Sequence, residues 1–329
     1  MSIVKNRYEI MALVEAKMCN PNGDPDMGNR PRIDYGTGHG IITDVAFKSR
    51  MRAYVADAYA NKDGYNILIQ RGVNLNRNIA EAVLEVSDDK VKTNAKTTTD
   101  AAMFMANKYW DVRTFGGVLS TGLNAGQVRG AVQVGMAISV DEIEVEDITI
   151  TRMAFVDGNS SKMSDYDKID EEKSEDKRRT MGTKQYTPYG LYVLKMTVSA
   201  NLAEKVGFTE EDLKVLLESV MQMYDVESSS SKMGMSVLTP VVVFKHVGTQ
   251  FDKTSEDNIR EAKLGCAPAY KLFDLLKVMK RDDVDVPRDH SDYNVVLELS
   301  KLPNGVECGL KTSVFGDIEW QDNSDKVLI

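Results

Sequence analysis

A long stretch rich in proline and glycine constrains this chain more than any other feature. It covers residues 19–42 and contains Pro21, Pro25 and Pro31 among five glycines. Because proline and glycine interrupt helices and β-ladders, we predict a long shaped loop. Loops of this length are uncommon in compact domains and are usually functional or disordered. The many Asn and Asp side chains favour a fixed path, because they form hydrogen bonds to nearby backbone in turns. The alternative is a solvated connection.

Periodic patterns flank this loop on both sides. Residues Tyr8–Lys17 alternate between apolar and polar types, which predicts a strand. After the loop, Thr43 is a suitable N-cap and Asp44 suits a first helical turn. The apolar side chains that follow recur at three- and four-residue spacing as far as about Tyr59, which predicts a helix.

Three cations lie on that helix. Lys48 and Arg52 are four residues apart and therefore share a face, whereas Arg50 lies nearer the opposite side. On an arbitrary helix such a pair would form a solvated face. Their position directly after the shaped loop favours phosphate contact.

The middle of the chain is less regular. We expect a finger-like insertion over 61–125, irregular as far as residue 96, with a helix from Thr99 or Asp100 through Trp110. A strand is predicted from Gly130 through Val140, with apolar residues alternating on one face: Val132, Val134, Met136 and Ile138. Two further strand-like arms, 148–156 and 191–199, flank a polar segment, which predicts a long projecting hairpin over 157–187.

The last third alternates helical and strand patterns. Thr209–Asp212 is a capping box that opens a helix, and Ser228–Gly234 is a turn that is either flexible or in contact with an anion. A β-rich run follows over 240–247, then a helix over 267–281 and a strand over 293–299. This order predicts an α+β fold of the split β-α-β type, the ferredoxin-like or RNA-recognition-motif class, as one domain over 1–329 with large insertions.

The charge distribution and the cysteines indicate which partners and which cellular compartment to expect. The net charge is −9, and residues 141–176 alone hold 13 acids and 4 bases, so the rest of the chain is balanced on average. A nucleic acid senses charge within a Debye length of about 8 to 10 Å, so local basic patches are sufficient for binding. Cys19, Cys266 and Cys308 are isolated, which favours a reducing cytoplasm and argues against a zinc site. No signal peptide or membrane span is evident, so we expect no membrane partner.

Four blocks carry a resemblance to a known family. They are NPNGDPDMGNRPRIDYGTGHGIITDV, DVRTFGG, GQVRGAVQVGMAISV and TMGTKQYTPYGLY, in that order. The chain resembles the backbone subunit of type I-C CRISPR Cascade complexes, which belongs to the Cas-seven family of the RAMP superfamily. The resemblance implies an RNA-recognition-like palm, fingers and a β-hairpin thumb. It also implies copies stacked head to tail along one CRISPR guide RNA, with other Cascade subunits at the filament ends and target DNA paired to the guide.

The site expected on this basis holds RNA and does not cut it, with no cofactor and no metal. Phosphate contacts require cations, amide donors and close backbone approach. Stacking against displaced bases requires apolar or aromatic side chains, for which we also considered Tyr186. The predicted RNA-binding residues are Asn22, Asn29, Arg30, Arg32, His39, Lys48, Arg50, Arg52, Gln127, Arg129, Met181, Lys184 and Tyr189.

Two other functions fit parts of the pattern. Related type III backbone subunits cut target RNA with an Asp in the first loop, and Asp24, Asp26 and Asp34 occupy the corresponding region. Carboxylates there can hold Mg²⁺, but beside Pro and Gly they more often cap turns, which we favour. The third possibility is an RNA-recognition-fold protein that acts outside any complex. No role is assigned to Lys232 in the serine-rich turn.

Overall fold

The central strand β1 (Tyr8–Cys19) organises the computed structural model, which describes residues 2–87, 94–174, 177–322 and 326–328. It pairs antiparallel with β10 (Thr180–Val198) on one side and β11 (Met235–His246) on the other. Successive side chains of a strand point to opposite faces. Ile10 and Val14 therefore lie in one hydrophobic core, and Met11 and Leu13 lie in a second. The predicted first strand is confirmed.

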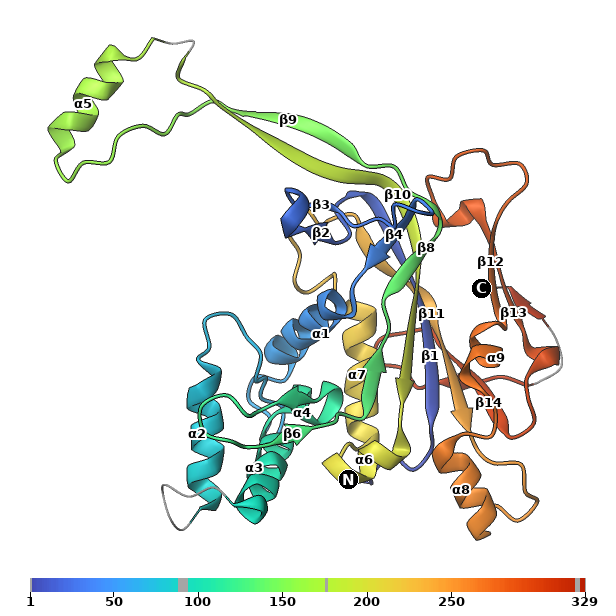
Figure 1. Cartoon of the computed structure of the whole chain (residues 1–329). Coiled ribbons are helices and arrows are strands. Elements are labelled where there is room, and N and C mark those ends of the chain that lie inside the picture. The colour runs from blue at the N-terminus through green and yellow to red at the C-terminus, as the bar shows by residue number, and fades with distance from the viewer. Residues whose placement is uncertain (1, 88–93, 175–176, 323–325, 329) are drawn as a thin grey trace.

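The main sheet is antiparallel and runs in the order β15-β14-β11-β1-β10-β8-β4, with β7 and β9 also paired to β10 (Figure 1). The remaining strands are β4 (His39–Ile42), β7 (Val132–Val134), β8 (Ala137–Glu142), β9 (Glu146–Arg152), β14 (Val306–Lys311) and β15 (Glu319–Trp320). The α+β class predicted from the sequence is confirmed by this large sheet and its helices.

Two helices cover one face of the sheet. Helix α1 (Asp44–Ala58) begins at Thr43, whose hydroxyl accepts from the Ala46 amide, and it buries Phe47 and Met51. Helix α7 (Glu210–Gln222) begins with the predicted capping box. Both pack on the core that contains the inner side chains of β1. Short α6 (Ala200–Val206) follows β10 directly. The strand order β11-β1-β10-β8, with α1 and α7 at the two crossovers, is that of a split β-α-β unit.

The segment after α1 is more helical than predicted. It forms α2 (Leu75–Val86), α3 (Ala95–Lys108) and α4 (Trp110–Phe115), and a small ribbon of β5 (Gly117–Val118) and β6 (Gln127–Val128). The expected helix start at Thr99 or Asp100 is wrong, because Asn94 caps α3 by accepting from the Thr97 amide. Helix α2 was missed, although Ile79, Ala82 and Val83 are buried at helical spacing. Residues 88–93 of the predicted insertion lie outside the described residues.

The single strand predicted over 130–140 is two strands, β7 and β8. Between them Gly135 donates to the Lys195 carbonyl, and the alternation shifts by one residue. Val132 and Val134 are buried as expected, but Met136 and Ile138 are 60% and 55% exposed. A one-residue shift moves every later side chain to the other face, which explains the difference.

The helix predicted over 267–281 is also wrong. Residues Ala269–Phe273 form α9, and Leu276–Lys280 form β12, which pairs with β13 (Tyr293–Glu298). Leu275 and Leu276 are buried as predicted, whereas Met279 is exposed. The late strand is confirmed as β13, and β16 (Lys326–Leu328) lies beside it. Helix α8 (Glu256–Leu264) precedes this C-terminal part.

A long two-stranded hairpin projects from the sheet (Figure 1). Its arms are β9 and the first half of β10, paired from Glu146↔Tyr186 to Arg152↔Thr180. The predicted second arm, 191–199, is wrong, because this part of β10 pairs with β1 and β8 in the main sheet. Every residue of β9 is exposed. The polar segment between the arms contains α5 (Met163–Glu172), which has no buried residue. Residues 175–176 of the predicted acidic segment lie outside the described residues. No helix within the described ranges is long and apolar enough to cross a membrane.

Candidate nucleic-acid interface

Three of the predicted RNA-binding segments meet at the turn Ser228–Gly234, which we call the serine turn. The amide of Asn20 donates to the Ser231 carbonyl at 3.0 Å, so the start of the first loop (residues 20–42) is attached to it. Lys184 of the hairpin arm donates to the Ser230 carbonyl at 3.2 Å. Arg50 of α1 donates to the carbonyl of Glu227, the residue before the turn. The serine turn therefore connects loop, helix and hairpin.

The approach of the serine turn to β1 requires glycine at position 234. The Lys17 amide donates to the Gly234 carbonyl at 2.8 Å. A Cβ at this position would lie 1.6 Å from the Lys17 carbonyl oxygen, closer than any side chain tolerates. The sequence shows a serine-rich turn, but nothing local indicates this close contact with a strand more than 200 residues earlier. Sequence reasoning therefore missed the central position of the serine turn.

The first loop has the fixed path that its Asn and Asp content predicts. The Asn22 side-chain oxygen accepts from the amide and hydroxyl of Thr43, at 2.9 and 3.0 Å, which ties the loop to the N-terminus of α1. Asn29 and the preceding Gly28 both have positive φ, 67° and 63°, in a left-handed turn. The Arg32 amide donates to the Asn22 carbonyl at 2.9 Å. Asn29 remains exposed at the tip of the loop.

Four predicted phosphate contacts are cations in ion pairs at the surface. Arg30 lies 3.8 Å from Asp147 of β9, and Arg32 lies 3.1 Å from Asp24. Lys48 lies 2.8 Å from Asp44, one helical turn earlier. Arg50 lies 3.4 Å from Glu227 in addition to the carbonyl contact. All four pairs have partly exposed side chains, and such pairs contribute only about 0 to 1 kcal/mol, so a phosphate can replace the carboxylate.

Arg52 has a different role from the one predicted. Its side chain is 10% exposed, and its Nε lies 2.8 Å from Asp111, which is 1% exposed. The same carboxylate accepts from the amides of Leu68 and Ile69. Lys48 and Arg52 do share a face, since both lie against the Phe115 ring. The prediction that Arg52 faces phosphate is corrected, because the buried Asp111 already neutralises it.

Gln127 is the first residue of β6, and Arg129 follows that strand directly. Both are exposed, and Arg129 has no acidic partner within the described ranges. The adjoining backbone is closely packed: a Cβ on Gly130 would lie 2.3 Å from the Gly116 amide nitrogen. The backbone next to these two side chains therefore packs against the end of α4, whose Phe115 also contacts α1.

The hairpin presents some predicted residues and buries others. Met181 is 74% exposed and Lys184 is partly exposed. Tyr189 is 5% exposed and donates to Glu15, and Tyr186 is 8% exposed and donates to Glu146. The idea that these two tyrosines stack against bases is therefore wrong for this structure. His39 is half-buried, with Nδ1 2.9 Å from the Ser139 carbonyl.

The aspartates of the first loop are engaged in turns. Asp24 accepts from the Asp26 amide at 3.1 Å and pairs with Arg32. Asp34 accepts from the Gly36 amide and the Thr37 hydroxyl, both at 2.9 Å, and these bonds lower its pKa. Asp26 is exposed. These contacts match the capping role favoured from the sequence.

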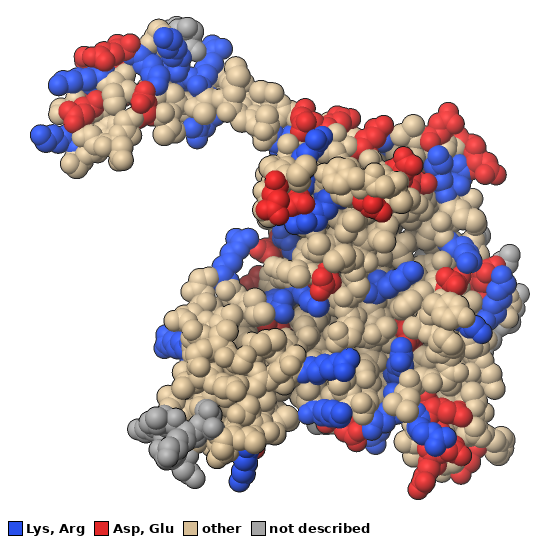
Figure 2. Space-filling model, viewed as in Figure 1, with Lys and Arg blue, Asp and Glu red and all other residues tan. Residues whose placement is uncertain are grey.

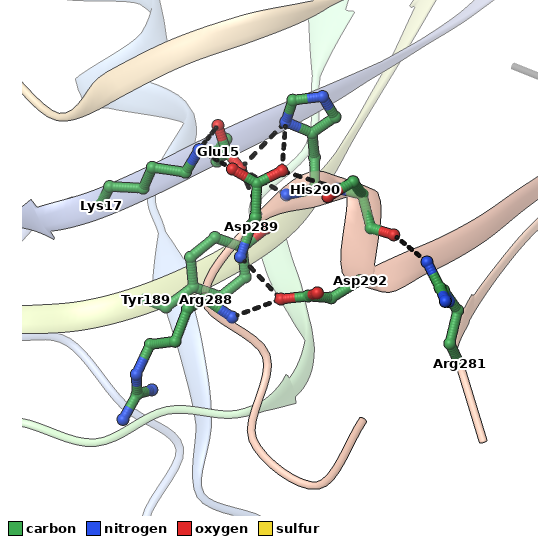
Figure 3. Close-up of polar contacts among 9 residues, drawn as sticks. Glu15, Lys17, Tyr189, Arg281, Arg288, Asp289, His290 and Asp292 are labelled. Atoms are coloured by element: carbon green, nitrogen blue, oxygen red, sulfur yellow. Dashed lines mark hydrogen bonds and ion pairs between the residues drawn. The ribbon is translucent and has the colours of Figure 1, made fainter. Parts of the chain in front are cut away.

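One cluster within the described ranges has the spacing of metal ligands, and it lies elsewhere (Figure 3). It comprises Glu15, Asp289 and His290. The ammonium of Lys17 is 2.6 Å from Asp289 and 3.1 Å from Glu15, and Tyr189 also donates to Glu15. The Lys17 bond lowers the pKa of Asp289. Lysine already supplies the positive charge, so this cluster joins β1 to the C-terminal part rather than holding a metal.

The distribution of charge differs between parts of the molecule (Figure 2). Lys and Arg side chains are spread across the middle of the visible face, between the helical lobe of α2 and α3 and the sheet. Acidic side chains gather at the two ends of the C-terminal side, and the hairpin tip carries both signs. The face therefore offers local positive charge despite the net charge of −9.

Comparisons with known proteins place the chain in a family. One curated relative, the CRISPR-associated protein Cas7 of Haloferax volcanii, is 35% identical over 118 residues, which are 35% of this chain and 33% of that protein. The chain thus matches about a third of that relative's length. A solved chain titled "CRISPR RNA-guided surveillance complex, pre-nicking" is 14% identical, with a TM-score of 0.46 and coverage of 80% of this chain and 83% of that one. Another, "CRISPR RNA-guided surveillance complex", is 15% identical, with a TM-score of 0.42 and coverage of 80% and 77%. The model of the family "CRISPR-associated protein Cas7" matches residues 6–298, so the chain belongs to the Cas7 family.

Proposed function

We propose that this protein is a non-catalytic backbone subunit that binds CRISPR guide RNA in a type I-C Cascade surveillance complex. Copies stack head to tail along the guide in the cytoplasm, other Cascade subunits close the ends, and the guide pairs with target DNA. The observation that carries the proposal is the family match over residues 6–298, most of the chain.

The geometry around the serine turn supports an RNA-binding role. Arg30, Lys184 and Arg50 come from loop, hairpin and helix, and all lie near this turn or the root of the hairpin. Phosphate contacts are independent of sequence, which suits a subunit that must accept every guide. The body of the chain is then the palm, residues 61–125 are fingers, and the β9–β10 hairpin is the thumb. Met181 replaces the buried tyrosines as the apolar group of the thumb.

Stacking of copies requires two complementary faces on one chain. The hairpin offers one such face, because every residue of β9 is exposed. An isolated two-stranded ribbon is only marginally stable in water. Contact with a neighbouring copy would stabilise it. The acidic residues of 141–176 supply charge for this contact.

The test is to purify the protein with its operon partners and sequence the RNA that copurifies. Discrete repeat-spacer RNAs in a complex with several copies of the chain are the expected result. Random cellular RNA, or a complex without RNA, would overturn the proposal. A folded monomer that binds short RNA but never assembles would favour an RNA-recognition protein that acts alone.

A further inference from the structure

Lys232 is a partly buried cation without a carboxylate partner in the described part of the chain. It lies in the serine turn, and its ammonium donates to the carbonyls of Asn20 and Pro21 at the start of the first loop. Its charged neighbour is Arg50, which has the same sign. Removing a charge even partly from water without an opposite charge nearby is costly, so we looked for a role that offsets this cost.

The two carbonyls are the acceptors that fix where the loop begins. Asn20 also contacts the tip of the loop, because its side-chain amide donates to the Asn29 carbonyl at 2.7 Å. Asn22, two residues further, holds Thr43 at the start of α1. A change at the Asn20–Pro21 peptide would therefore shift both the tip and the helix junction. Lys232 holds this peptide from the serine turn.

We propose that Lys232 is a positioning residue of the RNA interface, which clamps the first loop to the serine turn at the expense of stability. This inference rests on the proposed function. Lys232 makes no direct contact with phosphate in this proposal. Its ammonium lies beneath the loop and donates its hydrogen bonds to backbone carbonyls there.

The electrostatics of the site support a cost in stability. Burial, followed by the charge of Arg50, lowers the pKa of Lys232 from 10.5 to about 8. Because the folded value is below the unfolded one, the charged amine destabilises the fold at pH 7. This cost disappears as the pH rises from about 8 towards 10.5. Two other groups face Lys232: burial raises the pKa of the Cys19 thiol to about 11, and Arg50 forms an ion pair with Glu227.

The same shift predicts that RNA binding takes up a proton. RNA binds the clamped loop, and the clamp requires the charged amine, which donates to the Asn20 and Pro21 carbonyls, so binding favours the charged form and raises its pKa. The affinity of the wild-type chain for single-stranded guide RNA should therefore fall between pH 7 and pH 9. Lys232→Arg should remove this dependence, because a guanidinium stays charged and can still donate to the two carbonyls.

The experiment compares Lys232→Met, Lys232→Arg and a control, Lys277→Met, whose lysine is exposed on β12. We expect Lys232→Met to bind guide RNA about tenfold more weakly at pH 7, the usual scale for removal of a charged hydrogen bond. Its melting temperature should be equal to or above that of the wild type. The salt slope of binding should not change, whereas removal of a direct phosphate contact would reduce it by about 0.7.

Three results would overturn the inference. They are an affinity of Lys232→Met within twofold of the wild type, a salt slope lower by about 0.7, or a marked fall in melting temperature. If the wild-type chain fails to bind guide RNA, the proposed function is wrong. The clamp can then still be tested separately by amide hydrogen exchange. In that case Lys232→Met must lower the protection of the Asn20 and Arg32 amides, both hydrogen-bonded in the loop. Unchanged protection would refute the clamp.

Discussion

The ion pairs between helices and those around the first loop use the same residue types in opposite settings. Arg52–Asp111, which joins α1 to α4, and Arg113–Asp212, which joins α4 to α7, are almost fully buried, at 2.8 and 2.6 Å. Around the loop, Arg30–Asp147 is open to solvent at 3.8 Å. Removing one partner of a buried pair leaves an uncompensated charge, whereas an exposed pair is readily replaced. Depth, rather than charge, separates the structural cations from those that we propose to contact RNA.

The largest effect should come from breaking a buried pair. We expect Arg52→Ala to lower the free energy of unfolding by about 3 to 5 kcal/mol, because Asp111 would remain buried without its cation. Lys48→Ala is a matched control on the same helix and should cost about 1 kcal/mol or less, since its pair is partly exposed. Urea unfolding of both variants measures the difference. Equal losses of stability would show that depth does not separate these two positions.

The second prediction concerns the projecting hairpin. Residues 157–179 contain no buried residue in the described part, so replacing them with a short Gly-Ser bridge should leave the body folded. Loop length matters little, since doubling it changes the closure free energy by about 0.6 kcal/mol. The deletion also removes Lys177, Arg178 and Arg179, and it disturbs the arm that carries Met181. Assemblies on RNA should therefore shorten or vanish.

Thermal melting and size-exclusion chromatography with RNA separate these two outcomes for the hairpin. A variant that melts normally but stays small on RNA supports its role as the thumb. Normal melting together with complete RNA-bound assemblies would show that the hairpin is not needed, and the thumb would have to be placed elsewhere.

Local sequence signals were sufficient for the elements that carry the fold. The alternation of β1, the N-cap at Thr43 and the capping box at Thr209 each lie within a few residues, and each was predicted correctly. The spacing of Leu272, Leu275 and Leu276 fits a helix that continues to residue 281. Pairing with β13 instead places Leu276–Lys280 in a strand. Such pairing with a distant segment overrides local propensity.

The candidate site was less predictable, because the burial of each side chain depends on partners that are distant in the sequence. Arg52 is buried by Asp111, which is 59 positions away, and Tyr189 by Glu15, which is 174 positions away. The clamp from Lys232 to Asn20 spans 212 positions. Residue type and spacing predicted that the first loop is shaped and that Asp24 caps a turn. They could not show which cation faces solvent.

The third prediction concerns the solvent-exposed cations around the first loop. Arg30→Ala combined with Lys184→Ala removes two cations at the root of the hairpin, where Arg30 lies by Asp147 and Lys184 pairs in register with the next residue, Ile148. The slope of log affinity against log salt for single-stranded RNA should fall by about 1.4, which is about 0.7 for each phosphate that no longer meets a cation. The melting temperature should change little. The control is Lys271→Ala with Lys277→Ala, two exposed lysines of the C-terminal part, and an equal drop in slope for this control would remove Arg30 and Lys184 from the site.

The smallest expected effect is none at all, and it concerns the aspartates of the first loop. Metal-dependent cleavage requires carboxylates that converge on an ion and remain free to bind it. Asp24 is held by Arg32 and by the Asp26 amide, and Asp34 by Gly36 and Thr37. The hydrogen bonds that lower the pKa of Asp34 stabilise its charged form as a turn cap, so it stays ionised at neutral pH without a metal. Complementary target RNA incubated with the guide-loaded protein and Mg²⁺ or Mn²⁺ should therefore stay intact on a denaturing gel. Replacing each aspartate by Asn preserves most of the capping bonds and should leave that pattern unchanged. Cleavage at regular intervals that Asp24→Asn, Asp26→Asn or Asp34→Asn abolishes would make the loop a nuclease centre, and its surface carboxylates would then be metal ligands rather than turn supports.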